Sequence, residues 1–67
     1  MRATVNGDVK ELEPPTTIAA LVQEITGSAE QRGVAVARNG EIVRRDAWSQ
    51  PVEDGDEIEI VRAVQGG

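Results

Sequence analysis

Two Asn-Gly pairs, each set between short runs that can form β-strands, constrain the fold of this 67-residue chain most strongly. They stand at residues 6–7 and 39–40. Asn-Gly supplies the positive φ angles of the tightest two-residue hairpin turns, so each pair predicts a β-hairpin. The strands so joined are short alternating or apolar runs: residues 1–5 with 9–12, and 33–38 with 41–43.

A helix is predicted between the two hairpins. Pro14-Pro15 ends the second strand, because proline cannot donate a hydrogen bond to a ladder. Thr16 or Thr17 can cap the helix that follows, and Gly27 stands where a left-handed C-terminal cap is expected. Apolar residues recur between these ends at i, i+3, i+4 and i+7, as one stripe of a short helix. They are Ile18, Leu21, Val22 and Ile25.

The segment after the second hairpin, residues 44–52, is predicted to be irregular. It holds Trp48, the one tryptophan of the chain. We interpret Trp48 as a packing residue at one end of a small core rather than as a binding anchor. We interpret Arg44-Arg45 as a solvated pair rather than as a clamp for phosphate.

A last strand is predicted at residues 57–61, after a turn at residues 53–56. Its alternation places Ile58 and Ile60 on one face. It has no local partner, so we expect it to pair with a strand of an earlier hairpin. One apolar helix stripe covers one face of one sheet. The sequence therefore predicts an α+β fold of the β-grasp, or ubiquitin-like, type: a mixed sheet of four to five strands on one main helix, in the order ββαββ(irregular)β.

The length and composition limit what such a fold can do. We expect one domain at residues 1–64 and a flexible tail at residues 65–67. The chain has no Cys and no His, so disulfides are excluded and the usual zinc ligands are missing. It also has no Tyr, and without these groups a self-contained active site is not expected. We expect a protein that is not an enzyme and binds no metal or cofactor.

The charge of the chain excludes other classes of function. A net charge of −5 disfavours binding to nucleic acid and to anionic membranes. No apolar run reaches the roughly 20 residues that span a bilayer, and the first residues do not resemble a signal peptide. We expect a soluble, cytoplasmic protein that is monomeric when free.

The final Gly66-Gly67 is the feature with most chemical content, since roughly one chain in 200 ends so by chance. One interpretation is a frayed terminus. The other starts from the terminal carboxylate, which is ionised at neutral pH and can attack the α-phosphorus of ATP in a partner enzyme. Glycine has no Cβ, so such an end can enter a narrow channel, and Gln65 to Gly67 extended reach about 10 Å. We predict Gly67 as the covalently modified residue and Gln65, Gly66 and Gly67 as the segment in the partner's channel.

Residues just before the tail are candidates for docking a partner. Exposed apolar side chains beside a reactive terminus form a docking patch, although the last strand can equally pack them. Five acids fall in seven positions from Glu53 to Glu59. We interpret this run either as a solvated turn and strand face or as a guide toward a basic partner surface. The docking candidates are Val61, Ala63, Val64, Glu57 and Glu59.

These segments together resemble the ThiS family, the sulfur carriers of thiamine (thiazole) biosynthesis. The resemblance covers nearly the whole chain. Each fragment alone is a weak signal, and the specificity comes from their full order with the Gly-Gly end. The fragments are Val5-Asn6-Gly7, Thr17-Ile-Ala-Ala-Leu21, Gly33-Val-Ala-Val-Ala37, Asn39-Gly-Glu-Ile-Val43, Arg45, Trp48, Asp54-Gly55-Asp56 and Ala63-Val-Gln-Gly-Gly67.

The resemblance implies a set of partners. An E1-like (ThiF-like) adenylyltransferase adenylates Gly67 and consumes ATP. Sulfur drawn from a cysteine desulfurase then gives a thiocarboxylate, and thiazole synthase (ThiG-like) receives that sulfur. One departure is that the family often reads Val-Pro-Arg before the tryptophan region, where this chain has Val43-Arg44-Arg45; we expect little change in function.

Three alternatives stay open at this point. The small subunit of molybdopterin synthase also ends in Gly-Gly, but often carries Pro-Pro where this chain has Arg62-Ala-Val-Gln. A ubiquitin-like modifier would join Gly67 to lysines of other proteins. A non-covalent β-grasp module would tolerate a residue added after Gly67. The sequence does not identify the final sulfur acceptor or the adenylyltransferase, or show whether the carrier acts free or in a stable complex.

Overall fold

The computed structural model describes residues 1–27 and 33–62. Its elements follow the predicted order, with a short 3₁₀-helix inside the segment predicted to be irregular. They are β1 (Arg2–Val5), β2 (Asp8–Glu11), α1 (Ile18–Thr26), β3 (Val34–Arg38), β4 (Glu41–Val43), the 3₁₀-helix (Arg45–Ala47) and β5 (Glu57–Arg62).

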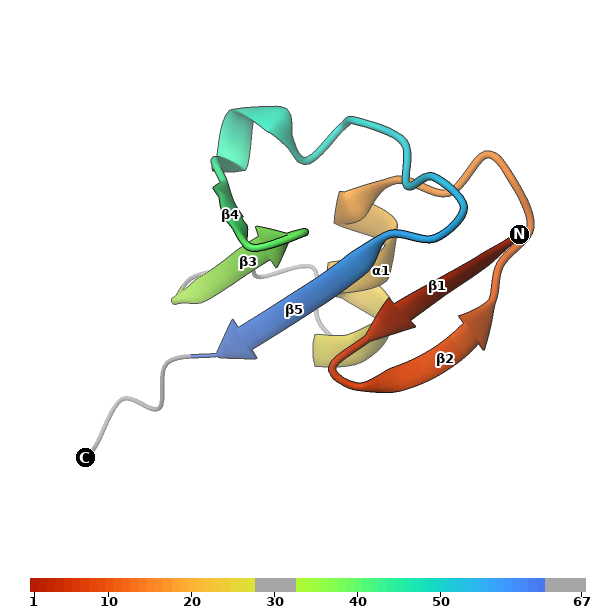
Figure 1. Ribbon diagram of the computed structural model, residues 1–67. Helices are drawn as coiled ribbons and strands as arrows, with labels where there is room; N and C mark the ends of the chain where they lie inside the picture. The colour runs from red at the N-terminus through yellow and green to blue at the C-terminus, as the bar shows by residue number, and fades with distance from the viewer. Residues whose placement is uncertain (28–32, 63–67) are drawn as a thin grey trace.

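The strands form one mixed sheet with α1 on one face (Figure 1). The spatial order is β2-β1-β5-β3-β4, so the last strand lies in the centre. β5 runs parallel to β1 and antiparallel to β3. The predicted pairing of the last strand with an earlier hairpin is confirmed, and β5 in fact joins both hairpins.

Both Asn-Gly pairs form the predicted turns. Asn6 and Gly7 have φ angles of 51° and 86°, and Asn39 and Gly40 have 52° and 85°. Positive φ at both central residues defines the type I′ turn, whose twist matches that of the flanking strands. The turns therefore fix the register of both hairpins, with Val5 opposite Asp8 and Arg38 opposite Glu41.

The ends of α1 are capped at the expected places. Thr17 is the N-cap, and its Oγ1 accepts a hydrogen bond of 3.1 Å from the N–H of Ala20. Thr16 instead donates its hydroxyl to the carbonyl of Glu13 at 2.7 Å. Gly27 closes the helix with a φ of 70°. Three of the four stripe residues are buried, whereas Ile25, in the last turn, is 40% exposed.

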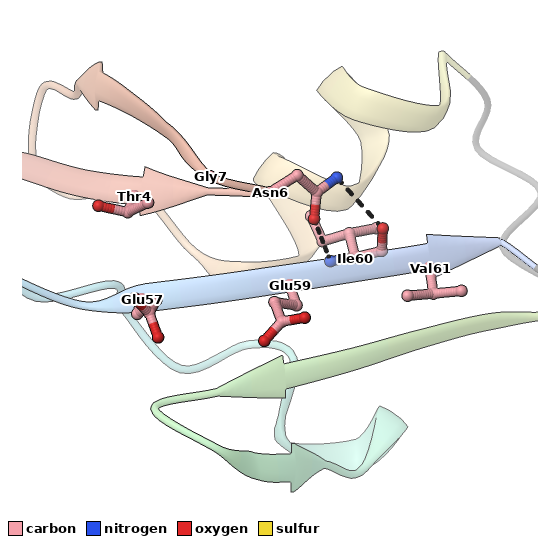
Figure 2. Close-up of a pocket in the computed structure, with 7 residues that line it drawn as sticks. All are labelled: Thr4, Asn6, Gly7, Glu57, Glu59, Ile60 and Val61. Carbon is pink, nitrogen blue, oxygen red and sulfur yellow. Dashed lines mark hydrogen bonds between the residues drawn. The ribbon is translucent and has the colours of Figure 1, made fainter.

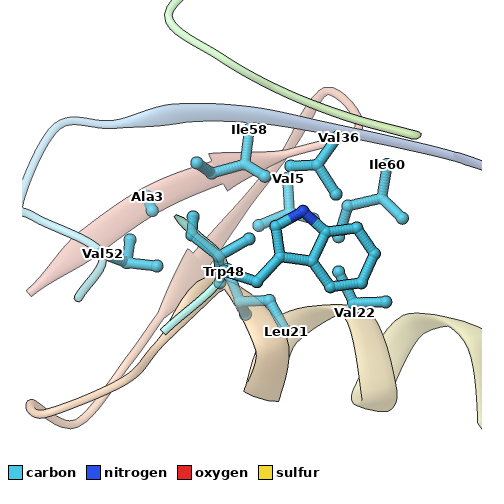
Figure 3. Close-up of a cluster of buried hydrophobic side chains, with 10 residues drawn as sticks. Ala3, Val5, Leu21, Val22, Val36, Trp48, Val52, Ile58 and Ile60 are labelled. Carbon is cyan, nitrogen blue, oxygen red and sulfur yellow. The ribbon is translucent and has the colours of Figure 1, made fainter. Parts of the chain in front are cut away.

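The core lies between α1 and the sheet, with the indole of Trp48 among side chains from both layers (Figure 3). Trp48 Nε1 donates to the carbonyl of Val43 at 3.2 Å, so its polar atom is satisfied. The guanidinium of Arg45 lies 5.1 Å from the centre of the indole ring, within the range of a cation–π contact. The interpretation of Trp48 as a packing residue is confirmed. The buried apolar residues are Ala3, Val5, Ile18, Leu21, Val22, Val36, Trp48, Val52, Ile58 and Ile60.

Asp56 corrects the interpretation of the acidic run as a solvated face, because its carboxylate is structural. It is only 7% exposed. Its oxygens accept from Arg38 at 2.7 Å, from the N–H of Glu53 at 2.8 Å and from Asn39 Nδ2 at 3.1 Å. Burial raises the pKa of Asp56, but these hydrogen bonds and the charge of Arg38 outweigh burial and hold it below its ordinary value. The carboxylate thus ties the turn before β5 to the end of β3.

We predict that Asp56→Asn lowers the free energy of unfolding by about 2 kcal/mol near neutral pH, because an amide turns an NH₂ group toward one of these donors. In a domain of this size the melting temperature should fall by roughly 10 °C. A carboxyl with a lowered folded pKa stabilises above its unfolded pKa of about 3.9, and the effect disappears as the pH falls through the folded pKa. Urea unfolding of both proteins at several pH values should therefore show their difference shrinking in acid. An equal difference in acid and at neutral pH would show that ionised Asp56 is not the cause.

Candidate functional site

No described element covers the face of the sheet turned away from α1 (Figure 1), and we call it the open face. Side chains alternate along β5, so Ile58 and Ile60 are buried while Glu57, Glu59 and Val61 are exposed. Residues opposite one another on neighbouring strands share a face. The register therefore assigns to the open face Arg2, Thr4, Val9, Glu11, Ala35, Ala37, Ile42, Glu57, Glu59 and Val61.

The open face carries most of the large hydrophobic side chains that are exposed among the described residues. Among the described residues, the exposed large hydrophobic side chains are Val9, Ile25, Ile42 and Val61, and only Ile25 is not on this face. Ile42 is 75% exposed, Val9 67% and Val61 60%. An exposed apolar surface rimmed by polar groups marks an interaction site.

Three of the five predicted docking candidates lie on this face. Glu57, Glu59 and Val61 are all exposed along β5. The candidates Ala63 and Val64 lie outside the described residues, as do Gln65, Gly66 and Gly67. The structure therefore brings together the part of the candidate site that precedes the tail.

Sequence reasoning missed Ile42 and Val9 as members of this face. A signal was available, because a two-residue type I′ turn at Asn39-Gly40 fixes the pairs on either side of it. That register sets Ile42 opposite Ala37, and Ala37 in turn lies opposite Glu59. Ile42, on β4, therefore joins the docking candidates of β5.

A hollow of about 520 Å³ lies beside β5 (Figure 2). It forms where β1 ends at Val5 while β5 continues to Arg62. Two carboxylates and an apolar side chain converge there, a combination that fits a partner segment with apolar and basic side chains. The lining residues are Thr4, Asn6, Gly7, Glu57, Glu59, Ile60 and Val61.

The amide of Asn6 closes one side of this hollow by binding the backbone of β5. Its Oδ1 accepts from the N–H of Ile60 at 2.8 Å, and its Nδ2 donates to the carbonyl of the same residue at 3.2 Å (Figure 2). Asn39 acts similarly near the start of β5, where its Oδ1 accepts from the N–H of Glu57 at 2.9 Å. Each turn asparagine thus holds one end of the central strand.

The described residues contain no cluster of side chains placed to bind a metal ion. Within 1–27 and 33–62, no group of three or more His, Cys, Asp or Glu side chains is placed to hold a metal ion. In the same part of the chain, every buried side-chain nitrogen and oxygen has a hydrogen-bond partner. No helix there is long and apolar enough to cross a membrane. The candidate functional site in this part of the molecule is therefore the open face, a surface on which a partner can dock.

Comparison with known proteins identifies the family. The model of the ThiS family matches residues 3–67. The chain belongs to the ThiS family. The sulfur carrier protein ThiS of Escherichia coli strain K12 is 31% identical over 68 aligned residues, with all of both chains covered.

Solved structures of ThiS proteins confirm the β-grasp fold. The crystal structure of the thiamine biosynthesis protein ThiS from Geobacter metallireducens superposes with a TM-score of 0.73 at 30% identity, covering all of both chains. The solution structure of a thiamine biosynthesis protein from that organism gives 0.74, covering 88% of its chain. The predicted mixed sheet on one main helix is therefore correct, at the upper end of the predicted number of strands.

A longer relative contains a ThiS-like segment. The thiazole synthase of Paramagnetospirillum magneticum strain AMB-1 is 38% identical over 68 residues, an alignment that takes in all of this chain. This chain spans only 20% of the length of that relative, so its synthase activity is not transferred here. The match instead shows a ThiS-like sequence in a protein named for thiazole synthesis.

Proposed function

We propose that this chain carries sulfur for thiazole formation in thiamine biosynthesis, as a thiocarboxylate on Gly67. The observation that carries the proposal is the family match, which runs through Gly67 and is supported by a sulfur carrier aligned over its full length. The reacting group lies outside the described residues, and its chemistry follows from the functional groups available. The chain acts as a substrate of partner enzymes and binds no cofactor of its own.

The proposed chemistry has two steps at the terminal carboxyl of Gly67. In the first, a carboxylate oxygen forms a bond to the α-phosphorus of ATP while the bond to the β-phosphate oxygen breaks, giving an acyl-adenylate and pyrophosphate. In the second, hydrosulfide attacks the carbonyl carbon and AMP leaves. A cysteine desulfurase holds the sulfur as a persulfide, from which a thiol reductant releases hydrosulfide and is itself oxidised to a disulfide. Neither step needs a side chain of the carrier, which agrees with the absence of Cys, His and Tyr.

The open face is proposed as the surface that docks the adenylyltransferase. β5 carries Glu59 and Val61 on this face and ends at Arg62, so a partner bound there lies beside the residues that lead to Gly67. The apolar side chains supply area to bury, and the carboxylates complement a basic surface. We propose a ThiF-like adenylyltransferase as this partner and a cysteine desulfurase as the sulfur source. Since the reaction consumes ATP, we propose that it takes place in the cytoplasm.

Thiazole synthase is proposed as the sulfur acceptor. The thiazole synthase relative contains a sequence 38% identical to this chain, which supports joint action of a carrier and a ThiG-like synthase. The same match favours thiazole over molybdopterin as the destination of the sulfur.

We predict that incubation with ATP, a ThiF-like adenylyltransferase and a cysteine-derived sulfur source adds the mass of one sulfur less one oxygen. Intact-mass spectrometry should place this gain in the C-terminal fragment. Deleting Gly67 should abolish the gain without changing the melting temperature, because glycine has no side chain to add to the core. No gain from an adenylyltransferase active on its own carrier would refute the proposed function.

We also predict that Gly66→Val lowers the rate of adenylation by at least tenfold, since a branched side chain obstructs a channel shaped for glycine. The rate is measured by release of pyrophosphate. Ala20→Val is the control, because it adds similar bulk at an exposed position of α1, away from the docking candidates and the tail. Full adenylation of Gly66→Val would argue against a narrow channel.

The open face gives a further prediction. Ile42→Ser should weaken binding of the adenylyltransferase about tenfold, because an apolar side chain no longer becomes buried in the complex. Ile25→Ser is the matched control, since Ile25 is also exposed but belongs to α1, on the other side of the sheet. Calorimetric titration measures both affinities. Equal losses in the two variants would remove the open face as the docking surface.

A further inference from the structure

The central strand extends further than one of its neighbours. β1 ends at Val5, and the chain turns away at Asn6-Gly7, while β5 continues to Arg62. The N–H of Asn6 still reaches the carbonyl of Ile58 at 2.9 Å, so the backbone groups of Ile58 face β1. Groups two residues apart on a strand face the same side. The N–H and carbonyl of Ile60 therefore face the side where β1 no longer runs.

The side chain of Asn6 takes the place of the missing strand. Its amide accepts from the N–H of Ile60 and donates to the carbonyl, at 2.8 Å and 3.2 Å. Both hydrogen bonds are partly buried. Ile60, the residue that Asn6 binds, lies between Glu59 and Val61. The side chains of these two neighbours lie on the open face and line the hollow (Figure 2).

We propose that Asn6 is a positioning residue for the reaction at Gly67: by clamping both backbone groups of Ile60, it fixes the part of β5 that docks the adenylyltransferase and leads into the tail. This role rests on the proposed function. Asn6 does not touch the reacting carboxyl, so it acts through the geometry of the strand. β3 still pairs with β5 as far as Arg62, but without the clamp the peptide groups of Ile60 on the other edge of β5 lose their protein partner. The strand could then twist further against β3, and the docked tail would align less often with ATP.

The chemistry of the clamp requires an asparagine at this place. One planar amide offers an acceptor and a donor side by side, which match the donor and acceptor of one residue of a strand. Aspartate keeps the acceptor but turns a second oxygen toward the carbonyl of Ile60. Asparagine also tolerates the φ of 51° that the turn imposes. Glycine tolerates that angle too, so Asn6→Gly removes the clamp without straining the turn.

The second turn provides a matched control. Asn39 has a φ of 52°, and its amide likewise makes two hydrogen bonds, from the N–H of Glu57 and to Asp56. These contacts lie at the start of β5, away from the tail. Asn39→Gly therefore removes an equivalent number of hydrogen bonds from an equivalent turn. A defect caused by lost stability alone should appear in both variants.

The test compares the wild-type chain, Asn6→Gly and Asn39→Gly at a temperature where circular dichroism shows all three folded. The substrate mixture is ATP with an adenylyltransferase that releases pyrophosphate with the wild-type chain. We expect kcat/KM to fall roughly tenfold for Asn6→Gly, through both a higher KM and a lower kcat, as misplacement of a reacting group predicts. For Asn39→Gly we expect a change within about twofold, as for a substitution outside the reacting geometry. Asn6→Asp, which keeps the acceptor for the N–H of Ile60, should give an intermediate value even if Asn6→Gly folds poorly.

Hydrogen exchange reports on the clamp without any partner. The Ile60 amide should exchange roughly fivefold faster in Asn6→Gly, as the loss of one hydrogen bond predicts, and the Glu57 amide should do so in Asn39→Gly. Equal losses of kcat/KM in the two glycine variants, or wild-type kcat/KM in Asn6→Gly with faster exchange at Ile60, would overturn the positioning role. A wild-type chain that no adenylyltransferase modifies would instead refute the proposed function, and the positioning role with it.

Discussion

The pairing of β5 with β1 on one side and β3 on the other holds the rest of the structure together. Each hairpin is local and closes through its own Asn-Gly turn, but neither has enough buried surface to be stable alone. β5 joins them into one sheet and places Ile58 and Ile60 against the helix. The polar contacts that secure β5 come from the two turns, through Asn6 and Asn39. Residues that close the hairpins locally therefore also bind the strand that arrives last in the sequence.

Much of the fold could be predicted from the sequence because its signals are local. A turn type, a helix cap and an alternating strand each depend on a few neighbouring residues, and all of these were placed correctly. The position of β5 in the sheet was harder to predict, since a strand without a local partner can pair with either hairpin. Here it pairs with both. The burial of Asp56 was missed for a related reason. In sequence it belongs to an acidic run, and only the fold brings Arg38 and Asn39 to its carboxylate.

In the candidate site too, features set by neighbouring residues could be predicted from the sequence, and features set by the tertiary fold could not. The exposure of Glu57, Glu59 and Val61 followed from alternation along a single strand. The contribution of Ile42 required the register of a second hairpin and the order of strands in the sheet. The hydrogen bonds of the Asn6 amide could not be predicted from the sequence, because Asn6 and Ile60 are 54 positions apart. The Gly-Gly end drew its meaning from chemistry and from resemblance to the ThiS family, and the family match through Gly67 supports that reading.

A carrier of an activated acyl group must also avoid reacting with itself. An acyl-adenylate is attacked by thiols and amines, and this chain has no cysteine and a single lysine, Lys10. That lysine lies on β2, at an edge of the sheet, where its ammonium forms an ion pair with Glu24 of α1 at 2.8 Å. The ion pair holds this side chain against α1, beside Glu24. Under the proposed function, a chain with no cysteine and one lysine side chain offers few nucleophiles of its own to an acyl group on Gly67, so a partner has to supply the sulfur.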